Sequence, residues 1–214
     1  MKKVLWGIVF VWGVGTVGAA TVEEVTARLE ATEKTVKTLS FDFKQTVESP
    51  SLNEPVSSAG TAVFQRPDLF RLTWDSSEPR TIISDGKTLW LHLPKRRQVL
   101  RDTVSRWFGA SGFPRELTPF QLSVSDMKAR YVWVLEEING IPVLKLTPKD
   151  PSADYSLRLW IDMKTGLAQK TEWVNPSGST TIDLSNVRMN PVLPKKAFDF
   201  SVPVGTDVLD TARS

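Results

Sequence analysis

Cysteine is absent from the 214 residues, and histidine occurs once, as His92. Without cysteine the chain has no disulfide, no thiolate metal ligand and no thiol nucleophile. A single histidine also excludes a multi-histidine metal site and a pair of histidines that exchange protons. A glycine-rich phosphate loop is missing too, and nothing positions a Ser–His–Asp arrangement. These absences argue against an enzyme, and we expect neither a cofactor nor a metal.

The chain lacks a large excess of either basic or acidic residues. The chain has 27 Lys and Arg residues against 24 Asp and Glu residues, a net charge of +3. Basic residues cluster only at Lys95-Arg96-Arg97, which is typical of a solvated turn. A nucleic-acid-binding protein would carry a basic excess on one face. We therefore expect no nucleic-acid partner.

Long apolar runs are missing except at the amino terminus. Met1-Lys2-Lys3 precedes an apolar run at residues 4–17, and small residues follow at 18–20. This is the pattern of a secretory signal peptide cleaved after Ala20. The alternative is a membrane anchor, but the run is shorter than the ~20 residues of a spanning helix. We expect a signal peptide at residues 1–20 and one exported, soluble, periplasmic domain at residues 21–214.

Residues 21–39 have the spacing of an amphipathic helix. Thr21 and Glu24 are placed as a capping box. An apolar stripe recurs at intervals of three and four residues, through Val22, Val25, Leu29, Thr32, Val36 and Leu39. A single such helix ahead of a run of strands must cover something.

The pattern then changes to alternating strands. We expect them at residues 41–47, 57–65, 70–74, 81–84, 88–93, 98–102, 131–138, 141–147, 155–161, 167–174 and 180–187. Asp85-Gly86 and Asn139-Gly140 are hairpin dipeptides. Residues 103–122 interrupt the strands and mix aromatics with glycine and proline, which favours short helical turns that pack on the protein. The prediction is a mainly β (α+β) domain. It has a single curved antiparallel sheet of about eleven strands, covered by the amino-terminal helix and the helical insert.

The stretch from Phe64 to Trp74 is the most informative part of this sheet. Phe70, Leu72 and Trp74 share one face of a strand, while Arg66 lies at a break beside Pro67. The row forms either an ordinary core or the wall of an apolar cavity. His92 alternates with Trp90 and is better explained as a half-buried histidine than as a catalytic one. Six tryptophans beyond residue 20 allow sugar stacking, although filling a broad core explains them as well.

Several short segments, in this order behind a signal peptide, together resemble the periplasmic outer-membrane lipoprotein carrier (LolA-like) family. They are Leu-Ser-Phe-Asp-Phe-Lys-Gln at 39–45, Arg-Pro-Asp-Leu-Phe at 66–70, Ser-Asp-Gly-Lys-Thr-Leu-Trp at 84–90, Thr-Pro-Phe at 118–120, Phe-Asp-Phe at 198–200 and Pro-Val-Gly at 203–205. The sequence departs from the family at Leu72, where an aromatic is frequent, and at His92, where a tyrosine is common. The insert also differs around residues 106–114.

The resemblance implies an unclosed β-barrel of about eleven strands with a helical lid. It implies a periplasmic chaperone, not an enzyme, that carries acylated lipoproteins from an inner-membrane ABC transporter to an outer-membrane receptor, working as a monomer. In the family, the arginine at the position of Arg66 bonds to the lid and keeps the empty cavity closed. Phe70 matches a family aromatic in the cavity.

On this basis we expect Arg66 to act as the lid latch. The expected acyl-cavity lining is Phe43, Phe64, Phe70, Leu72, Trp74, Leu89 and Leu91. The expected lid residues are Val25, Leu29, Val36, Trp107 and Phe120. A general periplasmic lipid-binding or envelope-sensing protein on the same fold is the alternative. A purely structural envelope protein is a further one.

Overall fold

Twelve strands form one sheet in the computed structural model, which describes residues 20–110 and 123–211. The strands of the first half are β1 (Thr38–Glu48), β2 (Val56–Gln65), β3 (Leu69–Asp75), β4 (Arg80–Asp85), β5 (Thr88–Leu93) and β6 (Gln98–Thr103). Those of the second half are β7 (Tyr131–Ile138), β8 (Ile141–Pro148), β9 (Ser156–Asp162), β10 (Leu167–Asn175) and β11 (Gly178–Met189), and β12 (Asp207–Asp210) follows.

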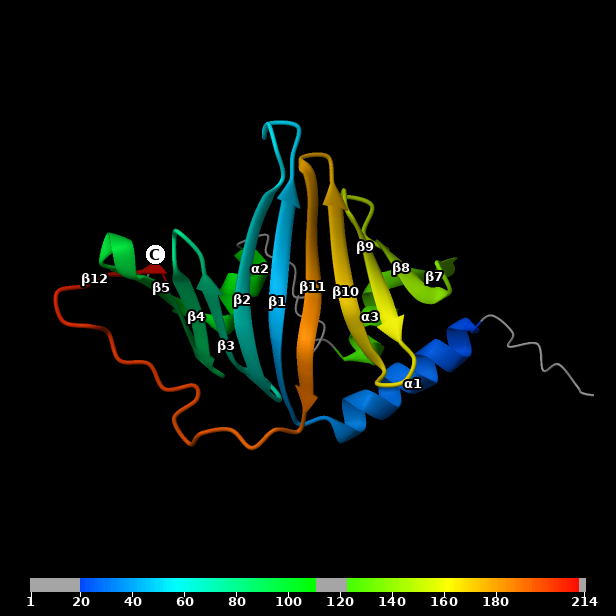
Figure 1. Ribbon diagram of the computed structural model, residues 1–214, viewed down its shortest axis with the longest axis horizontal. Helices are drawn as coiled ribbons and strands as arrows, with labels where there is room; N and C mark the ends of the chain where they lie inside the picture. The colour runs from blue at the N-terminus through cyan, green and yellow to red at the C-terminus, as the bar shows by residue number, and fades with distance from the viewer. Residues whose placement is uncertain (1–19, 111–122, 212–214) are drawn as a thin grey trace, which may run out of the picture.

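The strand order is β12-β6-β5-β4-β3-β2-β1-β11-β10-β9-β8-β7. Two meanders, β1–β6 and β7–β11, are joined where β1 pairs with β11 (Figure 1). The edge strands β12 and β7 do not pair with each other, so the barrel stays open. The mainly β, unclosed sheet expected from the sequence is therefore confirmed.

The observed sheet differs at one edge from the prediction of about eleven antiparallel strands. It has twelve strands in the described residues, because β12 adds to the edge of β6, and this pair is parallel whereas the other pairs are antiparallel. A strand of four residues has too short an alternation to be recognised, and its partner is more than a hundred residues away. The Asn139-Gly140 turn was correct, since both residues have positive φ, 53° and 75°.

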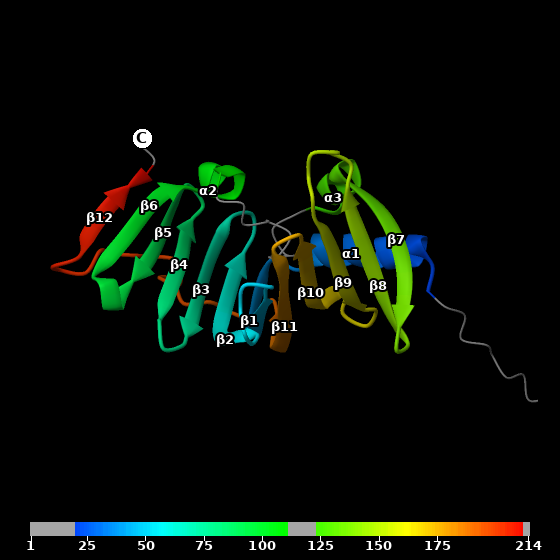
Figure 2. The ribbon, with the colours of Figure 1, turned by 90° about the horizontal axis from the view of Figure 1, so that it is seen from above.

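The strands bury one residue in two, as expected for a sheet with one covered face. Along β3 the buried residues are Phe70, Leu72 and Trp74, and along β9 they are Leu157, Leu159 and Ile161. These side chains lie on the concave face. Figure 2 shows the sheet from above, with α2 (Val104–Ala110) and α3 (Val124–Arg130) on the same side of it.

The amino-terminal helix α1 (Val22–Thr35) is shorter than the predicted 21–39. Its capping box is present: the Glu24 amide donates to Thr21 Oγ1 and the Thr21 amide donates to Glu24 Oε2. The helix ends because Val36 is extended, with φ −90° and ψ 112°. Leu39 already belongs to β1, where pairing with β2 and β11 overrides the helical spacing.

The carboxy-terminal segment crosses the convex face before it reaches β12. Arg71 Nε donates to the Ala197 carbonyl at 2.7 Å, and Nη2 donates to the Asp199 carbonyl at 2.8 Å. Phe200 packs against the rings of Trp90 and His92, with centroids 5.8 and 5.6 Å away. His92 therefore lies on the side opposite the concave interior. The described residues hold no group of three or more His, Cys, Asp and Glu placed to bind a metal.

Gly60 on β2 is required by close packing on the concave face. A Cβ there would lie 2.6 Å from Phe43 Cζ and 2.1 Å from the Thr73 carbonyl oxygen. The Phe43 ring therefore lies over the glycine and meets Trp74 edge-on, with centroids 5.2 Å apart.

We expect Gly60→Val to lower the free energy of unfolding by roughly 1–3 kcal/mol, because the core cannot make room for the added carbons. Urea unfolding followed by tryptophan fluorescence measures this. Ala59→Val is the matched control, since Ala59 is the exposed neighbour on the other face. Equal effects of the two substitutions would show that the contact with Phe43 is unimportant.

Candidate functional site

Two apolar clusters cover the concave face. The first cluster is built on β1–β5 and consists of Val36, Leu39, Phe41, Phe43, Ala62, Phe64, Phe70, Leu72, Trp74, Ile82, Leu89 and Val104. The second cluster is built on β7–β10, α1 and α3 and consists of Val25, Val124, Met127, Tyr131, Leu144, Leu146, Leu157, Leu159, Ile161 and Ala168. Together they supply the apolar interior of an open sheet.

The first cluster is rich in aromatic contacts. Phe41 stacks on Phe64 with centroids 5.6 Å apart, and Phe64 stacks on Phe70 at 6.0 Å. Phe64 and Phe70 are paired across β2 and β3. At the far end of β3, Trp74 Nε1 donates to Gln45 Oε1 at 3.0 Å, which satisfies its polar group. The row predicted from the sequence is thus one well-packed surface.

A cavity of about 50 Å³ lies where the two clusters meet, beneath α1 and α3. It is lined by Leu29, Thr32, Glu33, Leu39, Phe41, Phe64, Arg66, Val124, Met127, Leu159, Ile161, Gly166, Leu167, Ala168 and Leu184. The lining is apolar except for Thr32, Glu33 and Arg66. One water molecule occupies about 30 Å³ of the liquid, so the space is far too small for an acyl chain.

Helix α1 closes the cavity and is tied to the β9–β10 turn. Arg28 Nε donates to the Met163 carbonyl at 3.0 Å, and Arg28 Nη2 donates to the Lys164 carbonyl. Thr32 Oγ1 donates to the Thr165 carbonyl at 2.8 Å. Gly166 makes this approach possible, because a Cβ on it would lie 2.2 Å from Thr32 Oγ1.

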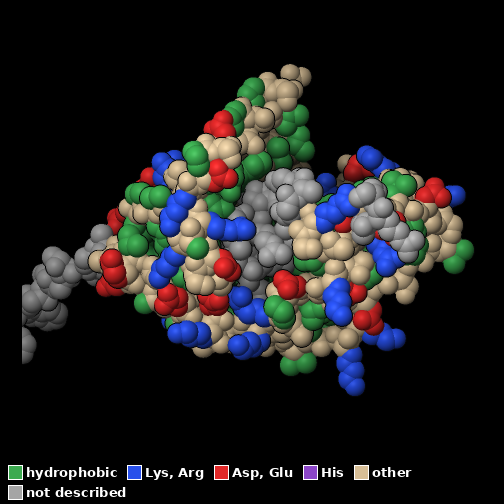
Figure 3. Space-filling view, turned by 180° about the vertical axis from the view of Figure 1, so that it is seen from behind, with side chains coloured by type: hydrophobic (Ala, Val, Ile, Leu, Met, Phe, Trp, Pro, Cys, Tyr) green, Lys and Arg blue, Asp and Glu red, His purple; other side chains and the backbone are tan. Residues whose placement is uncertain are grey.

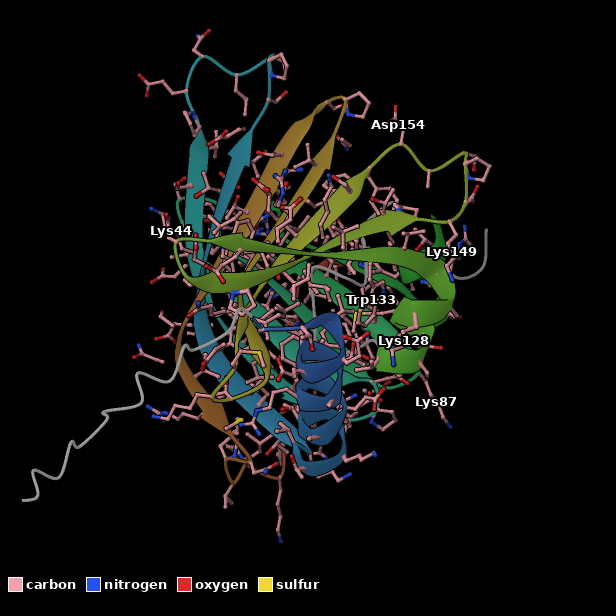
Figure 4. The ribbon with its side chains drawn as sticks, turned by 90° about the vertical axis from the view of Figure 1, so that its right-hand side faces the viewer. Lys44, Lys87, Lys128, Trp133, Lys149 and Asp154 are labelled. Atoms are coloured by element: carbon pink, nitrogen blue, oxygen red, sulfur yellow. The ribbon has the colours of Figure 1, made fainter. Side chains whose placement is uncertain are left out.

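Helix α3 is tied to α1 in turn. The backbone N–H of Val124, at the start of α3, donates to Glu33 Oε2 at 2.9 Å. Lys128 Nζ pairs with Glu30 Oε1 at 2.9 Å, and Trp133 Nε1 donates to the Met127 carbonyl at 3.3 Å. Figure 4 shows Lys128 beside α1, with Trp133 next to it. The two helices thus form one cover, joined by these polar contacts and by the apolar packing of Val25, Val124 and Met127 in the second cluster.

Arg66 lies at the edge of the cavity, just past β2. Its Nε donates to the Val36 carbonyl at 3.3 Å, and its backbone N–H donates to the Lys37 carbonyl at 3.0 Å. Both carbonyls follow the end of α1. Burial lowers the pKa of the Arg66 guanidinium, and the nearby Glu33 carboxylate opposes this shift. The guanidinium therefore connects the β2–β3 break to the carboxy-terminal end of the cover.

The structure brings most of the predicted site residues together. Phe43, Phe64, Phe70, Leu72, Trp74, Leu89 and Val36 all belong to the first cluster, and Leu91 and Trp107 pack against it. Val25 belongs to the second cluster, and Leu29 packs against that one. Among the residues predicted to line the acyl cavity, only Phe64 lines the observed cavity. The predicted lid residue Leu29 and the predicted latch Arg66 line it as well. Phe120 lies outside the described residues.

Several residues around the cavity were not predicted. Helix α3 was missed, although Ser123 accepts a hydrogen bond from the Asp126 amide and this spacing is a helix-start signal. Seven residues are too few to show a helical period. The contacts of Glu33, Arg28 and Gly166 join segments far apart in the chain, so no local pattern could have identified them.

Known proteins share much of this sequence. The family model described as "Outer membrane lipoprotein carrier protein LolA" matches residues 34–201. The chain is 31% identical to the "Outer-membrane lipoprotein carrier protein" of Bordetella avium, over 85% of each chain. It is 29% identical to the protein of the same name from Glaesserella parasuis, over 98% of this chain and 96% of that one.

A solved structure has a similar fold. An uncharacterized conserved protein from Thermus thermophilus superposes with a TM-score of 0.56, covering 88% of this chain and 98% of that chain, at 9% identity. This likeness concerns the fold alone. Across the described residues, every helix is too short or too polar to cross a membrane.

Gly166→Ala should push α1 away from the β9–β10 turn, because the new methyl group would overlap Thr32. We expect a loss of roughly 1–3 kcal/mol in the free energy of unfolding beyond the strain of the positive φ itself. We also expect increased binding of an apolar fluorescent dye, since the cavity would be uncovered.

Gly140→Ala is the control for that experiment. Gly140 has φ +75°, close to the +69° of Gly166, but no atom lies within 4 Å of its added Cβ. It therefore reports the backbone strain without the overlap. If both variants lose the same stability and bind the same amount of dye, the contact between Gly166 and α1 does not hold the cover.

Proposed function

Because the chain belongs to the outer membrane lipoprotein carrier protein (LolA) family, we propose that it carries lipoproteins by enclosing their acyl chains in the concave interior of the open barrel. The observation that supports this most is the closed apolar cavity between two apolar clusters, beneath a cover held by polar contacts. An interior built in this way can be emptied and filled without breaking strand pairs.

Energetics favour such an arrangement for acyl cargo. Each CH₂ group moved from water into an apolar site contributes about 0.8 kcal/mol, so a lipid anchor gains much from enclosure. The described cavity has a volume of about 50 Å³, so in our proposal α1 and α3 move before an acyl chain enters. When the carrier is empty, closure keeps the apolar surface away from water and prevents aggregation.

Arg66 is the proposed latch of this cover. A hydrogen bond from a charged donor contributes about 1.5–3 kcal/mol, which biases the closed state while leaving it easy to open. Cargo then acts by binding the open state better than the closed one. The partial burial of the guanidinium supports a contact that is made and broken, since water can solvate the charge once the cover opens.

The route of transfer follows from the same assignment. We propose that the protein works in the periplasm after its signal peptide, residues 1–20, is removed. There it takes acylated lipoproteins from an inner-membrane ABC transporter and passes them to an outer-membrane receptor. Binding is proposed without catalysis. A general lipid shuttle would instead bind phospholipid as readily as triacylated peptide.

Arg66→Leu should shift the empty protein toward the open state. Loss of one charge-assisted hydrogen bond raises the affinity for acylated lipoprotein by about ten- to a hundred-fold and slows release to the receptor. A transfer assay with purified lipoprotein and receptor measures both. Arg66→Lys, which keeps a charged donor, should lie between wild type and Arg66→Leu. Release at the wild-type rate by Arg66→Leu would contradict the latch.

Leu91→Gln should weaken cargo retention by about tenfold, because it places an amide in the proposed acyl site. Leu91 is only partly buried, so the fold tolerates this change better than a polar group at Phe70, which is 1% exposed. His92→Gln is the control on the opposite face of the same strand. Mass spectrometry of co-purified lipid and peptide is the measurement, and unchanged lipoprotein in Leu91→Gln would place cargo elsewhere.

A further inference from the structure

One apolar row crosses the concave face as far as the edge of the sheet. Pairing places Ala62 beside Leu72, Leu72 beside Ile82, Ile82 beside Leu91, Leu91 beside Leu100, and Leu100 beside Leu209. Paired residues point to the same face of a sheet. The row therefore runs from β2 through β3, β4, β5 and β6 to β12.

The row becomes exposed toward that edge. Ala62 is 1% exposed and Leu72 and Ile82 are each 7% exposed, whereas Leu209 is 47% exposed. Leu91 and Leu100 are intermediate. The apolar row thus ends in a solvent-exposed residue at the β12 edge, at the end of the sheet opposite to the cover formed by α1 and α3 (Figure 2).

A pocket with three cations flanks this exposed end. It has a volume of about 80 Å³ and is lined by Glu78, Pro79, Arg80, Leu93, Lys95 and Arg96. We call Arg80, Lys95 and Arg96 the basic corner. Arg80 follows the β3–β4 turn, and Lys95 and Arg96 belong to the 3-10 turn η1 (Pro94–Arg96) between β5 and β6. Arg80 begins β4 and lies on the same face as Ile82. Leu93 ends β5 and lies on the same face as Leu91.

Arg80 is fixed without a carboxylate partner. Its guanidinium carbon lies 4.4 Å from the centroid of the Trp74 ring, and Nη2 is 3.5 Å from Gln45 Oε1. Burial lowers the pKa of its guanidinium. The acidic side chains on the adjoining turns, Glu78 and Asp207, are exposed, and within the described ranges neither forms an ion pair with a member of the basic corner. Glu78 lines the same pocket, so the three cations leave a net positive charge there.

From this juxtaposition we propose that the β12 end of the sheet is a membrane-docking surface, where the basic corner binds the phosphates of anionic phospholipid headgroups beside the exposed end of the apolar row. The proposal rests on the carrier function and names the surface by which the carrier approaches lipid. Figure 3 views the side opposite to Figure 1, with this end on the right, where Lys and Arg side chains lie among apolar, acidic and other ones.

The chemistry fits a lipid surface. Arginine forks and lysine ammonium groups bind phosphate through charge-assisted hydrogen bonds, and each basic residue near an anionic membrane adds to binding. Interfacial binding also needs apolar groups next to the charges. Leu209, which is 47% exposed, and the partly buried Leu100 provide them. An acidic protein surface would match the charges alone and would leave the exposed end of the apolar row without a partner.

Vesicle sedimentation with the full mature chain tests the proposal. Vesicles of phosphatidylglycerol and phosphatidylcholine in equal parts are compared with vesicles of phosphatidylcholine alone. We expect binding only to the anionic vesicles. In the double variant Lys95→Gln/Arg96→Gln we expect binding about 30-fold weaker. Arg80→Gln should weaken binding as well, and its unfolding curve shows whether the fold is kept.

Lys195→Gln/Lys196→Gln is the matched control. It removes the same two charges from exposed positions that precede the convex-face contacts of Arg71, and it should bind anionic vesicles like wild type. Equal losses in the two double variants would mean that net charge alone is measured, and would overturn the proposal. The proposal would also be overturned if the wild-type protein did not bind anionic vesicles. It would be overturned as well if inorganic phosphate, added at constant ionic strength, displaced the wild-type protein from the vesicles.

The carrier function is checked separately. Detergent-solubilised acylated lipoprotein should bind Lys95→Gln/Arg96→Gln as it binds wild type, because the cargo interior is untouched. If the double variant keeps vesicle binding but loses transfer to a purified receptor protein, the basic corner binds an acidic protein and the lipid assignment is wrong. If wild type binds vesicles but no lipoprotein, the proposed function fails while the docking surface stands.

Discussion

The sheet does not close on itself, and this constraint governs the rest of the structure. A closed barrel fills its interior with side chains from strands alone. Here the edges β12 and β7 stay apart, so the apolar concave face has to be covered by helices and by the curvature of the sheet. The resulting interior is divided into two clusters with a small cavity at their junction. The cavity lies beneath α1 and α3, so the proposed function needs these helices to move while the strand pairing remains intact.

Side-chain hydrogen bonds help to attach the cover to the sheet, whereas apolar packing holds the core together. Arg28 and Thr32 donate to carbonyls of the β9–β10 turn, Glu33 accepts from the start of α3, and Arg66 donates to the carbonyl after α1. Hydrogen bonds exchange readily with water, so their net contribution is modest. Apolar packing, in contrast, is lost in proportion to the area exposed. A cover with many polar contacts and a small buried stripe suits a carrier that must open repeatedly.

Much of the fold could be predicted because the signals are local. Alternation at Phe70, Leu72 and Trp74, the hairpin at Asn139-Gly140 and the capping box at Thr21 each depend on residues within a few positions. Pairings such as β1 with β11 and β6 with β12 join segments more than a hundred residues apart, and no local pattern reports them. The end of α1 was misplaced for the same reason, since Leu39 continues the helical stripe yet pairs in the sheet.

The sequence by itself determined the class of the protein: a cysteine-free β domain behind a signal-like start, with an apolar row, an arginine at a strand break and the segments shared with a carrier family. Composition and alternation decide these features because they depend on single residues and near neighbours. Only the tertiary structure decided which side chains meet. It placed Arg66 at the carbonyl of Val36, Gly166 against Thr32, and an uncompensated Arg80 beside an apolar row that reaches solvent at Leu209. These contacts arise from long-range strand pairing, which brings distant residues together.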